Sequence, residues 1–145
     1  MVFWSAFADQ KLAPPPLTGS LREDMIAMLQ AAQGRFRAVG ASTYYGVLAE
    51  ADGELLRAVA HFVETVTAHI VDPILTTARE RGEIGMSPIP AHITGLAIAI
   101  LRDQMIVPMA QTPTIPEIVD DIYLPLLRSA ASAHTGAEPE RERVT

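Results

Sequence analysis

The sequence predicts an all-α fold of about six helices. Apolar residues recur at intervals of three and four along most of the chain, capping residues stand where this periodicity starts, and prolines or glycines stand where it stops. The 145 residues suffice for one hydrophobic core, since a chain of this length buries roughly 70% of its unfolded surface. We expect residues 1–133 to form one domain and the charged, uncapped residues 134–145 to be a disordered tail.

Composition and charge exclude several classes of function. The net charge of −6, from 17 acidic and 11 basic residues, repels phosphate backbones, so the chain alone is a poor partner for nucleic acid. The lack of cysteine excludes disulfides and thiolate metal sites and fits a cytoplasmic protein. The longest apolar run, residues 93–101, is much shorter than the ~20 residues of a membrane span, so no membrane partner is predicted.

Three helices are predicted in the N-terminal third. The first, over residues 2–10, is rich in aromatic residues and ends before three consecutive prolines. The second starts at Ser20, which with Glu23 forms a capping-box pattern, and fades by Gly40. A shorter helix over residues 42–51 ends at an Asp-Gly turn signal.

Three longer helices complete the prediction. The first spans residues 54–81 and keeps its apolar stripe through Pro73, which we expect to kink it. The next runs over residues 90–107, with a proline suited to its first turn. The last starts with a second capping-box pattern at Thr114 and runs to Ser132.

The helix over residues 90–107 predicts how subunits assemble. It is apolar on nearly all sides, so it must be covered all round, and a second copy of the chain is the natural cover for a late helix. The last two long helices would then form a four-helix dimer interface between two six-helix bundles. The alternative is that both helices lie in the core of a monomer. The residues predicted to line the homodimer interface are Ile93, Leu96, Ala97, Ile100, Ile118, Val119, Ile122, Tyr123 and Leu126.

Three segments carry a resemblance to a known family. They are TGSLRED at 18–24, ARERGEI at 78–84 and PEIVDDIYLPLL at 116–127. In this order and spacing they resemble the start, a helix end and the closing helix of the C-terminal regulatory domain of TetR-type transcriptional regulators. The resemblance implies a domain that dimerises and senses an effector, typically within a repressor. It also implies that DNA is contacted only through a helix-turn-helix domain absent from this chain.

The effector is expected to be an apolar small molecule in a cavity among the first five helices. Methionine and aromatic side chains suit such a cavity, and a histidine would offer a polar contact, although most of these side chains have core packing as the alternative. No metal site is predicted, because the two central histidines lack a third close ligand. The residues predicted to bind the ligand are Trp4, Phe7, Met28, Tyr44, Tyr45, His61, Phe62, Thr65, His69 and Met105.

Two other functions remain open at this point. One is an interaction module that dimerises without a ligand, which a well-filled core would favour. The other is a small helical enzyme, for which only the surroundings of His61 and His69 offer titratable groups. The sequence has no nucleophile motif, glycine-rich phosphate loop or carboxylate pair at a mechanistic spacing, so we predict neither an enzyme nor a cofactor.

Overall fold

The computed structural model describes residues 16–40, 46, 49–50, 52–106 and 110–132. Within these residues the chain forms six α-helices and one π-helix, without a β-strand, so the predicted all-α class is confirmed. The helix predicted over residues 2–10 and the tail at 134–145 lie outside the described residues, as does most of the helix predicted over 42–51. None of the described helices is long and apolar enough to cross a membrane.

Helix α2, Leu21–Val39, begins where its capping residues predict. The Ser20 side chain accepts a hydrogen bond from the Glu23 amide at 3.4 Å, and Gly40 follows the helix with a φ of 87°. One face of the helix is buried, because its apolar side chains recur at helical spacing. The buried residues of α2 are Leu21, Asp24, Met25, Met28, Leu29 and Ala32.

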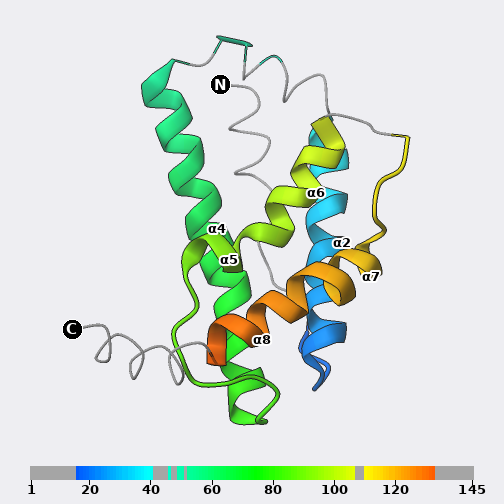
Figure 1. The fold of residues 1–145 in the computed structure, drawn as a ribbon. Coiled ribbons are helices and arrows are strands. Elements are labelled where there is room, and N and C mark those ends of the chain that lie inside the picture. The colour runs from blue at the N-terminus through cyan, green and yellow to red at the C-terminus, as the bar shows by residue number, and fades with distance from the viewer. Residues whose placement is uncertain (1–15, 41–45, 47–48, 51, 107–109, 133–145) are drawn as a thin grey trace, which may run out of the picture.

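Helix α4, Gly53–Glu80, continues through Pro73 and ends before Gly82, which has a φ of 77°. Its C-terminal part packs into the core, whereas the described side chains of its first half are mostly exposed. Figure 1 shows α2 and α4 standing side by side, with the later helices crossing them. The buried residues of α4 are Ile70, Val71, Ile74, Leu75 and Ala78.

The prediction of a single helix over residues 90–107 is wrong, because the structure has two helices in this segment. Helix α5, Ala91–Thr94, and helix α6, Leu96–Ile106, are separated at Gly95. Glycine weakens a helix interior, and the Tyr123 hydroxyl donates a hydrogen bond to the Thr94 carbonyl, which a continuous helix would reserve for an amide four residues later. The break therefore has a local cause and a tertiary cause.

The last predicted helix is present as three consecutive segments, α7, Ile115–Glu117, η1, Ile118–Tyr123, and α8, Leu124–Ser132. The predicted capping box is confirmed, with both reciprocal hydrogen bonds between Thr114 and Glu117 present. The middle segment is a π-helix that precedes Pro125. Since proline has no amide and its ring crowds the carbonyl four residues back, a wider turn here accommodates it within a continuing helix.

A polar cluster joins three distant parts of this core. The Glu83 carboxylate accepts hydrogen bonds from the Leu21 amide at 3.2 Å and from Arg81 at 2.6 Å. At the same end of α2, Arg22 forms a two-point ion pair with Asp120 of η1, at 2.8 and 3.0 Å. The start of α2 is thereby fixed to the loop after α4 and to η1.

Glu83 makes the stability of the fold depend on pH. Burial raises the pKa of its carboxyl, but hydrogen bonds from Arg81 and the Leu21 amide outweigh burial and leave the pKa below its ordinary value of 4.5. A lowered pKa in the folded state contributes stability that is complete above the ordinary value and is lost as the pH falls through the folded value.

We therefore expect Glu83→Gln to lower the free energy of unfolding near neutral pH, and we expect this deficit to shrink below about pH 4.5. Urea unfolding across the acid range measures it. The matched control is Glu80→Gln, since Glu80 is exposed at the end of α4. A deficit that stays constant with pH would contradict this role of the carboxylate.

Candidate functional site

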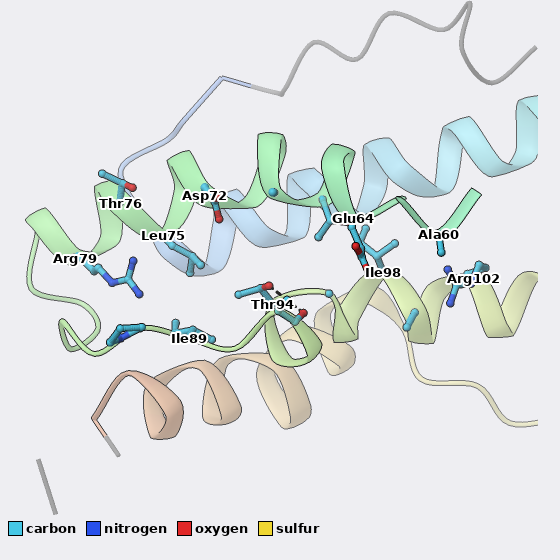
Figure 2. Close-up of a pocket in the computed structure, with 16 residues that line it drawn as sticks. Ala60, Glu64, Asp72, Leu75, Thr76, Arg79, Ile89, Thr94, Ile98 and Arg102 are labelled. Carbon is cyan, nitrogen blue, oxygen red and sulfur yellow. Dashed lines mark hydrogen bonds between the residues drawn. The ribbon is translucent and has the colours of Figure 1, made fainter. Parts of the chain in front are cut away.

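An open groove of about 740 Å³ lies between α4 and the chain from Pro88 to Arg102, which includes α5 and the start of α6. Figure 2 shows side chains from both walls directed toward the space between them. The wall from α4 contains Ala60, Glu64, Thr67, Ala68, Asp72, Leu75, Thr76 and Arg79. The opposite wall contains Pro88, Ile89, Ala91, Thr94, Gly95, Ile98, Ala99 and Arg102.

The α4 wall is one face of a helix. Its residues recur at four-residue spacing from Ala60 through Ala68 to Thr76, with further members one row away. Half of them are alanine or threonine, and the facing wall also has small residues at Gly95 and Ala99. Because these side chains are short, the two walls leave space between them instead of interlocking.

The groove is lined mainly by apolar side chains, with two acidic and two basic residues among them. Leu75, Ile89 and Ile98 supply its larger apolar side chains. Glu64 and Asp72 are exposed on the α4 wall, whereas Arg79 and Arg102 are half-buried on opposite walls. A mainly apolar cleft with a few polar groups is typical of a small-molecule site.

Tyr123 connects the groove to the C-terminal helical segments. Its side chain is fully buried, and burial raises the pKa of its hydroxyl, which therefore stays protonated and can donate. The acceptor is the carbonyl of Thr94, a residue that lines the groove. The hydrogen bond fixes the α5 end of the groove to η1.

None of the described residues predicted to bind the ligand lines this groove. Met28 is buried in the core on α2, and Met105 is half-buried on α6. His61, Thr65 and His69 are exposed on α4 and form a row beside the groove row, offset by one residue.

The remaining residues of that prediction have no described side chain. Trp4, Phe7, Tyr44 and Tyr45 lie outside the described residues, as does the side chain of Phe62. The two histidines do not gather a metal set, since no group of three or more potential ligands is found among the described residues. The groove-lining residues of α4 could not be predicted from the sequence, because alanines and threonines at helical spacing are also typical of an ordinary exposed helix face.

The structure divides the predicted dimer-interface residues into two sets. Ala97, Ile118, Val119 and Tyr123 are completely buried within the core of the single chain. The other residues keep accessible surface that a second subunit would bury. They are Ile93, Leu96, Ile100 and Ile122, which are half-buried, and Leu126, which is 38% exposed.

Comparison with known families places this helical domain in a regulatory class. Residues 15–122 match the family model described as "Tetracyclin repressor-like, C-terminal domain". Because the match covers well over half of the chain, the chain belongs to this family, and the resemblance seen in its three sequence segments is confirmed. Searches of curated proteins and of solved structures gave no match.

The buried hydroxyl of Tyr123 has a measurable role. Tyr123→Phe keeps the ring but leaves the Thr94 carbonyl without this donor, so we expect the free energy of unfolding to fall by about 1–2 kcal/mol. Urea unfolding measures the loss, and circular dichroism should show that the helix content is kept. Unchanged stability would mean that the hydrogen bond does not fasten α5 to η1.

Proposed function

We propose that this domain binds an apolar small-molecule effector in the groove between α4 and the α5–α6 segment, and that it works as a homodimer. The observation that carries the proposal is the groove itself, on a domain of a regulatory family. Its volume of about 740 Å³ falls within the range of roughly 300–1,000 Å³ of small-molecule sites. Sensing requires no catalytic group.

The preference for an apolar effector is supported by the lining. Leu75, Ile89 and Ile98 offer aliphatic surface, and alanines contribute methyl groups from both walls. Removing apolar ligand surface from water stabilises a complex by about 25 cal/mol per Å² before the costs of binding are counted. A ligand that reaches along the groove would therefore gain most of its binding energy from burial.

The proposed dimer surface lies on residues of α6, η1 and α8 that do not line the groove. Leu96 and Ile100 are one turn apart on α6, and Ile122 and Leu126 are one turn apart across η1 and α8. All four keep accessible surface in the single chain. A two-fold arrangement would bury each pair against its copy.

Helix α6 would transmit the signal, because it contributes to both surfaces. Ile98 and Ala99 line the groove, while Leu96 and Ile100 belong to the proposed interface. An effector that changes the distance between α4 and α6 would change how two subunits are oriented. We assign no DNA contact to the described residues and leave that role to a helix-turn-helix domain.

The dimer is tested by Leu126→Glu. We expect the wild-type chain to have the mass of a dimer, and we expect the variant to dissociate at least about tenfold more readily, since the interface would bury a charge. Light scattering coupled to size exclusion over a wide concentration range measures it. The matched control is Leu56→Glu, because Leu56 is a 45% exposed leucine of α4 outside the proposed interface. A wild-type chain that stays monomeric would contradict the proposal.

The effector site is tested by filling the groove. We expect apolar ligands from a screened panel to raise the midpoint of thermal unfolding, by an amount equivalent to about 2.7 kcal/mol at a concentration 100 times Kd. Ala99→Phe should abolish this shift, because its ring occupies the groove. Ala58→Phe, on an exposed position of α4 outside the groove, should keep it. If no ligand shifts the wild-type midpoint, the chain is better described as a ligand-free dimerisation module.

A further inference from the structure

The groove is long and has different chemistry at its two ends. It follows α4 from Ala60 to Arg79, about 28 Å at the rise of an α-helix. Figure 2 shows Arg79 at one end, close to the loop that carries Ile89, and Arg102 near Ala60 at the other end. A ligand that spans the groove would meet a guanidinium at each end and a mainly aliphatic surface between them.

Arg79 has fewer partners than its environment requires. It is half-buried, and its only hydrogen bond among the described residues runs from Nη2 to the Ser87 carbonyl at 3.2 Å. Its Nε is buried without a partner, and no described carboxylate lies within ion-pair distance. Arg81, two residues later, forms an ion pair with Glu83 at 2.6 Å. The described residues therefore neutralise Arg81, outside the groove, and leave Arg79, inside it, without a counter-charge.

A half-buried guanidinium with unused donors favours an anion. It loses hydration, and it offers a planar fork of N–H groups that matches the two oxygens of a carboxylate. Such charge-assisted bonds are about twice as strong as neutral ones, and more so where water is restricted. Arg79 lines the groove, but its Nε is buried, so a two-point contact with a carboxylate would require the side chain to turn toward the ligand.

The remaining lining restricts the rest of the ligand beyond its anionic group. Leu75 and Ile89 lie next to the Arg79 end, and Ala68, Gly95 and Ile98 continue the wall, which suits a thin aliphatic chain. Asp72 lies two turns before Arg79 on α4, and Glu64 lies further along it. These carboxylates disfavour a second negative charge along the ligand, because like charges in a partly dry groove repel.

We propose that the groove takes a single-chain amphiphile with one carboxylate, whose head binds Arg79 and whose alkyl chain extends toward Ile98 and Ala99. This inference rests on the proposed effector site and deepens it, because it names the class of effector and its orientation. Arg102, at the other end, does not hold the head.

The first test needs no variant. Decanoate, decanol and decylamine, each below its aggregation limit, are compared by calorimetry and thermal shift with the wild-type protein. We expect decanoate to bind at least about tenfold more tightly than decanol, and decylamine to bind more weakly than either. Equal binding of decanoate and decanol would overturn the anionic head and leave the apolar effector site standing. If none of the three bound, the inference and this groove as the effector site would both fall.

The second test locates the head group. Arg79→Gln should weaken decanoate binding at least about tenfold and leave decanol binding unchanged, while Arg79→Lys should lie between, since it keeps the charge but not the fork. The matched control is Arg57→Gln, an exposed arginine of the same helix α4 outside the groove, which should leave both affinities near the wild-type values. If Arg102→Gln weakened decanoate and Arg79→Gln did not, the proposed orientation would be wrong. Circular dichroism of each variant ensures that lost binding is not lost folding.

Discussion

The first turn of α2 is the constraint on which the rest of the fold depends. Within four residues its backbone donates to Glu83, its arginine pairs with Asp120, and the buried Asp24 accepts from the Thr18 amide and hydroxyl at 2.7 and 2.8 Å. These contacts bring together the three sequence segments that carry the family resemblance. The resemblance of these segments to the family therefore has a physical explanation, since their residues join α2, the end of α4 and η1 at one point.

That junction also determines where the groove ends. Glu83 fixes the loop after α4, and the loop then passes α8 so closely that a Cβ at Gly85 would lie 2.6 Å from the Ala131 carbonyl oxygen. The Ser87 amide donates to the same carbonyl at 3.0 Å. The next residues, Pro88 and Ile89, form the groove wall opposite Arg79, so a polar contact at α2 fixes an apolar surface some distance away.

Sequence patterns predicted the parts of the fold that depend on local chemistry. The capping residues Ser20 and Thr114 mark true helix starts, because a cap acts within four residues. The break at Gly95 depends partly on the Tyr123 hydroxyl, which lies 29 residues from Thr94 in sequence and which no local pattern records. Apolar periodicity also could not separate the core-facing Ala97 from the half-buried Ile100, because residues 96–101 of α6 are all apolar. The alanines that line the groove also gave no sequence pattern that predicts a binding site. The large side chains from which a site was predicted include residues that pack in the core, such as Met28.

In the proposed function, α6 lies between the groove and the half-buried residues of the proposed interface, so a ligand in the groove could affect how two subunits pack. A ligand shifts a conformational equilibrium only by its difference in affinity for the two states, so its contacts must change when the protein moves. A groove whose walls come from α4 and from α5–α6 meets this condition, because any movement of α6 changes the distance between the walls. The break at Gly95 separates α6 from α5, and the Tyr123 hydroxyl fastens α5 to η1. If the domain senses an effector as proposed, this break is where α6 would move relative to α5.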